Sequence, residues 1–344
     1  IVVLDGYCLN PGDISWAPFE KLGGLTVYER TSLTDEEEIA GRIAGAEVVL
    51  TNKTPLTRAV LERCPHLRYV GVLATGYNVV DIESARQRGI PVCNVPSYGT
   101  RAVAQFAIAL LLELCHHVGG HDQAVHEGAW SRCPDYCFWN WPLVELAGKT
   151  MGIVGYGRIG RAVGAVAAAL GMEVIATGPR PWAAGTAEAE WVTLEELLCR
   201  ADVVSLHCPL TVENRGMIDR AAIEKMKQGA FLINNSRGQL IVEQDVADAL
   251  NSGRLGGAGL DVAETEPLSP DSPLLTAKNC IITPHISWAP RESRQRQLEL
   301  IDASGMTASD IRADALANRY QVVYVDYLQI VEPETRKANR TEQV

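Results

Sequence analysis

The chain has 344 residues, which is enough for two domains of ordinary size with a hydrophobic core each. Its hydrophobic fraction of 47% and charged fraction of 21% are typical of a globular protein and exclude a disordered one. The net charge of -11 argues against a nucleic-acid surface, which needs clustered cations, and no apolar run approaches the roughly 20 residues of a membrane span.

The first hundred residues alternate short apolar strands with amphipathic helical stretches, such as residues 35–43 and 56–63. Strands separated by helices of this length pair in parallel through right-handed crossovers. This part of the sequence therefore predicts one α/β domain. Its predicted strands are residues 1–5, 25–28, 48–51, 69–72 and 91–94.

A long apolar helix is predicted from residue 101 to about 117, and we expect it to run, buried, between the two domains. The segment 119–141 that follows is expected to be irregular. Its aromatic content suits a subunit interface or the closure of an active site, and packing against its own domain is the alternative. The aromatic residues are Trp130, Tyr136, Phe138, Trp139 and Trp141.

A second α/β series begins at Lys149, with short amphipathic helices such as 161–170 and 244–252. This arrangement predicts a doubly wound sheet. The fold class is therefore α/β, with two Rossmann-like domains that each contain a doubly wound parallel sheet. The predicted strands of this second part are residues 150–154, 173–177, 203–207, 231–234, 257–260 and 280–283.

The nine cysteines are scattered singly along the chain, which fits buried thiols of a reducing compartment better than a disulfide framework. No signal-like apolar stretch precedes the first predicted strand. We therefore expect a cytoplasmic protein.

The strand at 150–154 leads into a Gly-x-Gly-x-x-Gly loop that opens a helix. Gly155 permits the tight turn, Gly157 lets the backbone approach a pyrophosphate, and Gly160 allows close packing of helix and strand. The pyrophosphate then sits against the helix N-terminus at Arg158 and Ile159. Both flanking elements are present, so the pattern predicts dinucleotide binding.

The end of the next strand carries no carboxylate to hold a ribose 2′-OH, because Gly178 stands there. Its absence removes repulsion against a 2′-phosphate, and Arg180 is able to pair with one. We therefore expect NADP(H), or the use of both dinucleotides. The alternative is that Arg180 is an exposed turn residue and that NAD is bound.

Three polar residues follow later strands, where doubly wound sheets bind their ligands. Reduction of a 2-keto acid needs a cation for the carboxylate, which Arg237 offers as a bidentate fork. It also needs a proton donor, and His285 paired with the carboxylate of Glu266 stays protonated for that role. Each residue alone is more often structural, so the prediction depends on the three together.

From residue 1 to about 300 the sequence resembles the D-isomer-specific 2-hydroxyacid dehydrogenases, and among them most the glycerate dehydrogenase (hydroxypyruvate reductase) branch. Several long motifs in the same order carry this resemblance. They are residues 73–81, 142–150 with the glycine loop, 207–211, 235–238, 260–267 and 284–288.

The resemblance implies a flavodoxin-like substrate domain of residues 1–97 and 286–304, and an NAD(P)-binding domain of residues 98–285. It also implies a homodimer that reversibly reduces hydroxypyruvate or glyoxylate to D-glycerate or glycolate, with Arg237, Glu266 and His285 as catalytic residues. Residues implied at the substrate are Lys53, Ala74, Thr75, Gly76 and Trp288. Further residues implied at the cofactor are Thr100, Ala104, His207, Cys208, Pro209, Asn235, Ser236 and Asp261, the last at the nicotinamide carboxamide.

The alternatives are a dehydrogenase for another D-2-hydroxy acid, including a phosphorylated one, and a dinucleotide-sensing corepressor-like module on the same fold. No extra basic cluster near residues 74–76 supports a phosphorylated substrate. A metal site was weighed at His116, His117, His121 and His126, and none is expected, because Gly119 and Gly120 should interrupt the helix between His117 and His121.

After about residue 300 the sequence departs from this family. Residues 321–330 and 339–342 resemble the acidic-strand motif of bacterial replicative helicases, yet the sequence contains no phosphate-binding loop of the Gly-x-x-x-x-Gly-Lys-Ser/Thr type. We interpret residues 305–344 as an atypical segment joined to the dehydrogenase-like part. The alternative is a divergent C-terminal helix and strand.

Overall fold

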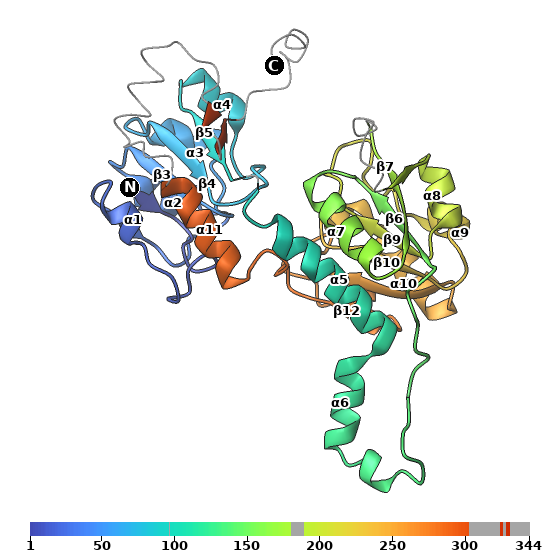
Figure 1. The fold of residues 1–344 in the computed structure, drawn as a ribbon. Helices are drawn as coiled ribbons and strands as arrows, with labels where there is room; N and C mark the ends of the chain where they lie inside the picture. The colour runs from blue at the N-terminus through green and yellow to red at the C-terminus, as the bar shows by residue number, and fades with distance from the viewer. Residues whose placement is uncertain (96, 180–188, 303–323, 326–327, 331–344) are drawn as a thin grey trace. The chain divides into compact units, whose positions relative to one another are not determined.

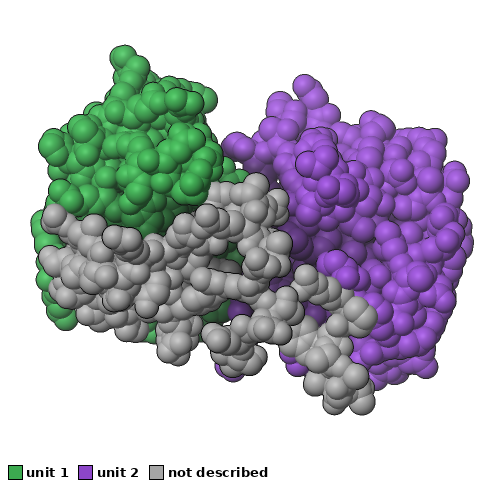
Figure 2. Space-filling model, turned by 90° about the horizontal axis from the view of Figure 1, so that it is seen from above, with its two compact units in different colours: residues 1–99, 289–344 green, residues 100–288 purple. Residues whose placement is uncertain are grey.

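The computed structural model describes residues 1–95, 97–179, 189–302, 324–325 and 328–330. The chain divides into two compact units, coloured separately in Figure 2. Unit 1 holds residues 1–99 and 289–344, and unit 2 holds residues 100–288.

Unit 1 is built on a seven-stranded sheet with the order β13-β14-β5-β4-β3-β1-β2. Strands β1 to β5 pair in parallel, whereas β14 pairs antiparallel with both β13 and β5. The strands are β1 Val2–Val3, β2 Thr26–Val27, β3 Val48–Thr51, β4 Tyr69–Val72, β5 Val92–Asn94, β13 Tyr324–Val325 and β14 Leu328–Ile330.

The helices of unit 1 begin where the sequence offers a cap. The Asp35 side chain accepts the N–H groups of Glu37 and Glu38, so the helix predicted over 35–43 starts one residue later. The predicted strands 48–51 and 69–72 are confirmed to the residue, and β1, β2 and β5 are shorter than predicted. The helices are α1 Ala17–Glu20, α2 Glu36–Ile43, α3 Arg58–Arg63, α4 Ile82–Gln87 and α11 Arg291–Asp302.

Helix α11 is joined to the N-terminal part of unit 1 by an ion pair. The Arg294 guanidinium donates to both carboxylate oxygens of Asp13, at 2.7 and 2.6 Å, and to the Leu9 carbonyl at 2.9 Å. Its side chain is only 9% exposed. The last described helix therefore belongs to the same unit as the first strands.

Unit 2 contains a second seven-stranded sheet, with the order β12-β11-β10-β9-β6-β7-β8 and parallel pairing throughout (Figure 1). The predicted strands 150–154 and 173–177 are confirmed to the residue, and β8 was not predicted. The strands are β6 Thr150–Val154, β7 Glu173–Thr177, β8 Glu190–Trp191, β9 Val203–Leu206, β10 Ala230–Asn234, β11 Leu255–Leu260 and β12 Cys280–Ile282.

Apolar side chains cover both faces of this sheet, as a parallel sheet requires. On β10, Phe231 and Ile233 pack with α5 and α7, whereas Leu232 between them packs with the helices of the other face. The helices are α5 Thr100–His116, α6 Val118–His126, α7 Arg158–Ala169, α8 Leu194–Arg200, α9 Arg220–Lys225 and α10 Glu243–Ser252, with short 3-10 helices at Trp130–Arg132, Gly238–Leu240 and Pro273–Thr276.

The expectation of an irregular segment over 119–141 was partly wrong. Figure 1 shows α6 leaving the body of unit 2, with the chain returning beside it in extended form. The helical path breaks at His117, which adopts a left-handed conformation with φ of 47°, and not at Gly119 or Gly120. Gly120 lies inside α6 against the Trp141 ring, where a Cβ would approach to 2.7 Å.

No single helix in the described parts of the chain is long and apolar enough to cross a membrane. Helices α5 and α6 pass such a test together by length and composition only, across a bend of 55°. The apolar side of α5 is buried in unit 2, with Leu110, Leu111 and Leu114 in the core. All nine cysteines are free thiols, but the expectation that they are buried holds only for Cys64, Cys93 and Cys115.

The C-terminal prediction is tested by ending the chain after Asn318. Strand β14 pairs with β5, but among the residues whose burial is described, the hydrophobic cluster of unit 1 lies within residues 2–92. We therefore expect the shortened protein to stay soluble, and to keep its thermal unfolding midpoint and turnover. A collapse of solubility and activity together would show that the segment is integral, and would contradict its interpretation as a join.

Candidate active site

The glycine loop of unit 2 lies where the strand order reverses, between β6 and its neighbours β9 and β7. Gly155 adopts φ of +94°, and a Cβ there would lie 2.6 Å from the Cys208 backbone nitrogen. The His207 N–H donates to the Val154 carbonyl at 2.7 Å. The structure thus brings together the predicted cofactor residues after β6 and those after β9, where exposed Pro209 follows.

The other two glycines differ in their surroundings as the sequence analysis expected. No atom lies within 4 Å of the position of a Cβ on Gly157, whereas a Cβ on Gly160 would meet the Gly155 carbonyl oxygen at 2.3 Å. Gly157 is the N-cap of α7, so no side chain caps the helix. Backbone N–H groups at Arg158 and Ile159 are therefore available to an anion, and these residues fit a bound pyrophosphate.

The region expected to choose between NAD and NADP is described in part. Gly178 follows β7, and a Cβ on it would contact the Trp191 ring of β8 at 3.4 Å. Arg180 lies outside the described residues.

Burial lowers the pKa of His207 to about 4, so its ring is neutral at neutral pH, and its Nε2 lies 2.8 Å from Ser205 Oγ.

Arg237 is held by the side chain of Asn234, which sequence reasoning missed. Asn234 is fully buried at the end of β10, and its amide donates to the Arg237 carbonyl at 2.9 Å. Its Oδ1 accepts the Ser236 N–H at 3.2 Å and the Ser236 hydroxyl at 3.0 Å. Asn side chains often close turns by hydrogen bonding to the backbone a few residues further on. The position of Asn234 at the end of a predicted strand was the signal from which this role could have been predicted.

Glu266 and His285 are brought together, with Glu266 Oε2 2.7 Å from His285 Nδ1. The His285 side chain is 26% exposed. The other oxygen of Glu266 accepts the Ala263 N–H at 3.2 Å. The carboxylate therefore orients the imidazole with Nδ1 engaged and leaves Nε2 as the nitrogen for chemistry.

The loop of Arg237 packs directly on the loop that leads to Glu266. A Cβ on Gly238 would overlap the Ala263 carbonyl, at 1.9 Å, so this position accepts only glycine. The Gln239 side chain also donates to the Glu264 carbonyl at 2.6 Å. This contact fixes the Arg237 loop against the loop that carries Glu266.

Asp261 is fully buried, and its carboxylate accepts hydrogen bonds from Thr283, Ile286 and Ser287. The contact with a nicotinamide carboxamide that the resemblance implies for Asp261 stays a prediction. In this structure the carboxylate binds the segment that carries His285.

The start of α5 adjoins the end of β10, since the Asn235 amide donates to the Val103 carbonyl at 2.9 Å. Thr100 and Ala104, which were expected to line the cofactor cleft, lie on the first turns of this helix. The Asn235 Oδ1 is buried and has no hydrogen-bond partner among the described residues. A buried acceptor without a partner fits a site whose ligand brings N–H donors.

The predicted substrate residues Lys53, Ala74, Thr75 and Gly76 belong to unit 1, in two loops that follow β3 and β4. The Asn94 amide donates to the Thr75 carbonyl at 2.7 Å, and the Val95 N–H donates to the Ala74 carbonyl at 3.1 Å. The loop of residues 74–76 is therefore held by the end of β5.

Asp5, which the sequence analysis did not single out, holds the Lys53 loop. Its carboxylate accepts the backbone N–H groups of Asn52, at 2.7 Å, of Lys53, and of Thr54, at 2.9 Å. An acidic residue directly after the first strand was the available signal. The Lys53 side chain itself is exposed.

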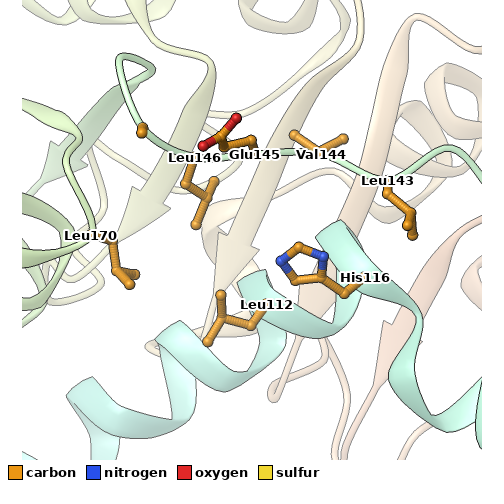
Figure 3. A pocket seen from close by; sticks show the side chains of 8 residues that line it. Leu112, His116, Leu143, Val144, Glu145, Leu146 and Leu170 are labelled. Atoms are coloured by element: carbon orange, nitrogen blue, oxygen red, sulfur yellow. The ribbon is translucent and has the colours of Figure 1, made fainter.

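An open hollow of about 410 Å³ lies elsewhere on unit 2, between the end of α5, the end of α7 and the returning segment (Figure 3). It contains none of the predicted catalytic or cofactor residues. Leu112, His116, Leu143, Val144, Glu145, Leu146, Ala147 and Leu170 line it.

His121, one of the four histidines considered as metal ligands, has other partners. His121 Nε2 accepts the Asn140 N–H at 3.1 Å, and its Nδ1 lies 2.9 Å from the His117 carbonyl. No group of three or more His, Cys, Asp or Glu side chains suited to a metal is found in the described ranges.

The chain is similar to several known proteins. The family model described as "D-isomer specific 2-hydroxyacid dehydrogenase, NAD binding domain" matches residues 108–287. Hydroxypyruvate reductase of Blautia hydrogenotrophica is 60% identical over 301 residues, which span 87% of this chain and 94% of that protein. Glycerate dehydrogenase of Methylorubrum extorquens is 37% identical, over 78% of this chain and 84% of that protein. The crystal structure of the TT0316 protein from Thermus thermophilus superposes with a TM-score of 0.77 and 34% identity, covering 91% of this chain and 96% of that one.

Gly157, the N-cap of α7, and Gly160, in the first turn of that helix, should respond differently to alanine. Gly157→Ala adds a methyl group where a phosphate approaches, so we expect unchanged stability and at least roughly tenfold weaker NADH binding. Gly160→Ala forces apart helix and strand, with a loss of about 1–3 kcal/mol in the free energy of unfolding. Denaturant unfolding and NADH fluorescence titration measure the two effects.

Gly41→Ala in α2 serves as the control, because that glycine has open space around it. We expect it to leave NADH binding unchanged. Equal NADH affinity in Gly157→Ala and the unmodified protein would contradict the phosphate-binding assignment.

Proposed function

The chain belongs to the D-isomer specific 2-hydroxyacid dehydrogenase family, and from that premise we propose that it reduces hydroxypyruvate or glyoxylate to D-glycerate or glycolate. The observation that carries this proposal is the 2.7 Å contact between His285 and Glu266, at the edge of the sheet where Arg237 also lies. The names of the two similar enzymes support the choice of substrate.

Arg237 is the group that binds the substrate carboxylate. Its guanidinium donates from Nη1 to the Ser236 carbonyl at 2.7 Å. A guanidinium carries five N–H donors, so this bond leaves a bidentate face for a carboxylate. The residue is half-buried, which strengthens such a charge pair relative to one in open solvent.

His285 is the general acid of the reduction. With Nδ1 turned to Glu266, its Nε2 donates a proton to the oxygen of the substrate carbonyl and accepts it back in the oxidation. The Glu266 carboxylate stabilises the protonated imidazole. The nicotinamide cofactor, when bound, supplies the hydride.

The cofactor is held by the glycine loop and the residues that follow β9. We propose NADP(H), or the use of both dinucleotides. Gly178 supports this, because it places no carboxylate at the end of β7 to repel a 2′-phosphate. Arg180, two residues further on, supplies the cation in this proposal.

We further propose a homodimer. The arm formed by α6 and the returning segment exposes several aromatic rings. An exposed patch of apolar side chains is unfavourable in water and usually marks a site of interaction with another molecule. A second copy of the chain would cover them, and the mass of the particle in solution tests this. The rings are those of Trp130, Tyr136, Trp139 and Trp141.

A steady-state panel tests the proposed activity. We expect turnover of hydroxypyruvate and glyoxylate above that of pyruvate and longer 2-keto acids, each assayed with NADH and with NADPH. Turnover with none of them would rule out the enzyme, and would leave a dinucleotide-binding module.

His285→Gln tests the mechanism. We expect kcat to fall by roughly 10²–10⁴-fold, because the general acid is lost, while NADH binding stays the same. His66→Gln is the control, because His66 lies exposed on unit 1 and should leave kcat unchanged. An unchanged rate in His285→Gln would remove that residue from its role.

A further inference from the structure

The loop that follows β4 is tied to the end of β5 by three hydrogen bonds. The Asn94 amide donates to the Thr75 carbonyl at 2.7 Å, and the Val95 N–H donates to the Ala74 carbonyl at 3.1 Å. The Thr75 hydroxyl in turn donates to the Val95 carbonyl at 3.2 Å. Strands β4 and β5 are neighbours in the sheet of unit 1, so a side chain at the end of β5 reaches the loop that leaves β4.

Of the groups that β5 contributes to these bonds, only the Asn94 amide depends on the residue type. Any residue but proline in place of Val95 would offer the same backbone N–H and carbonyl. Asn94 is 4% exposed, so its amide finds its partner within the protein. The Asn94 Oδ1 is buried and has no hydrogen-bond partner among the described residues, so the contribution of this side chain is its NH₂ donor.

The bond from Asn94 sets the direction of a backbone N–H group as well as that of a carbonyl. The peptide units of this loop are trans and therefore planar, so the N–H of each unit points opposite to its C=O. With the Thr75 carbonyl directed to Asn94, the Gly76 N–H is directed away from it. The Val95 N–H holds the Ala74 carbonyl in the same way, which turns the Thr75 N–H away from β5.

These backbone N–H groups lie at the carboxyl edge of the sheet. Those of Thr75, Gly76 and Tyr77 have no acceptor within the part of the chain that the structure describes. Thr75 and Tyr77 are exposed, and Gly76 is half-buried. Consecutive backbone N–H groups of this kind bind anions, and the carboxyl edge of a parallel sheet is where such folds bind ligands. The loop therefore suits the carboxylate of a 2-keto acid.

The glycine in this loop makes the orientation of the Thr75–Gly76 peptide unit depend on an outside contact. Glycine adopts positive as well as negative φ at little cost, so the peptide unit that precedes it rotates easily. Without a donor at the end of β5, the Thr75 carbonyl turns outward to water and the Gly76 N–H turns inward. A carbonyl oxygen then faces the anion where a donor is needed.

We infer that Asn94 is a positioning residue for substrate binding, whose amide holds the Thr75–Gly76 peptide unit so that the Gly76 N–H faces the substrate carboxylate. This inference rests on the proposed function, and on the substrate contact that the resemblance implies for residues 74–76. Asn94 acts through the backbone of Thr75 and does not itself touch the substrate.

Asn94→Leu is the central variant, because leucine has a similar size but no donor. We expect KM for hydroxypyruvate to rise at least about tenfold, since a hydrogen bond to a charged group is lost. A contact made equally in the ground state and the transition state affects KM and leaves kcat nearly unchanged. The dissociation constant of NADH should stay the same, because the glycine loop belongs to unit 2.

Thr75→Val is the second variant, in case Asn94→Leu does not fold. It removes the hydroxyl that donates to the Val95 carbonyl and leaves the bond from Asn94 in place. We expect the same rise in KM on a smaller scale, about two- to fivefold, again with kcat nearly unchanged.

Asn10→Leu is the matched control, because Asn10 is also a buried asparagine of unit 1 whose amide donates to a backbone carbonyl at 2.7 Å, that of Ile14. Its Oδ1 also accepts the N–H groups of Gly12 and Ile14. This variant loses more hydrogen bonds than Asn94→Leu, so its thermal unfolding midpoint should fall at least as far. We expect KM for hydroxypyruvate to stay unchanged.

An active unmodified enzyme whose folded Asn94→Leu and Thr75→Val variants keep the original KM would overturn the inference alone. An equal rise of KM in Asn10→Leu would overturn it too, because the effect would then be one of general destabilisation. No turnover by the unmodified enzyme with any 2-keto acid would reject the proposed function, and this inference with it.

Discussion

The candidate site depends on one constraint, which is that the loops leaving neighbouring parallel strands must fit side by side at one edge of the sheet. Adjacent strands lie only about 4.8 Å apart, so these loops pack backbone against backbone. A Cβ on Gly155 would meet Cys208, and a Cβ on Gly238 would overlap Ala263. Arg237, Glu266 and His285 follow β10, β11 and β12, so contacts between neighbouring loops position them.

Much of the sheet in unit 2 could be predicted from the sequence, because buried parallel strands are continuous apolar runs. Strands β6 and β7 agree with the prediction to the residue. Strand β8 was missed, because a strand of two residues is too short to show an alternation of apolar and polar side chains. Helix α8 lies between two predicted strands, where a short helix was expected, and Thr193 and Glu196 form a capping box at its start.

The prediction failed most clearly in the arm, for a physical reason that the local sequence does not carry. Gly119 and Gly120 were interpreted as helix breakers from their intrinsic propensity. Gly120 is instead a contact surface, because the Trp141 ring occupies the space of its missing side chain. The contact with Trp141, which is distant in the sequence, therefore outweighs the low helix propensity of Gly120.

The site itself was predictable only where residue types carry the chemistry. Arg237, Glu266 and His285 stand out because few side chains bind a carboxylate or donate a proton at neutral pH. Asn234, Gly238 and Asp261 contact backbone groups, which every residue has, and Asn234 and Asp261 also accept nearby hydroxyl groups, so no distinctive residue pattern marks their partners. All three are buried, whereas Arg237 and His285 are half-buried and Glu266 is exposed. This division follows from hydrogen-bond capacity, because a buried polar group must find its partners within the protein, whereas a group that binds substrate must keep some of its capacity open.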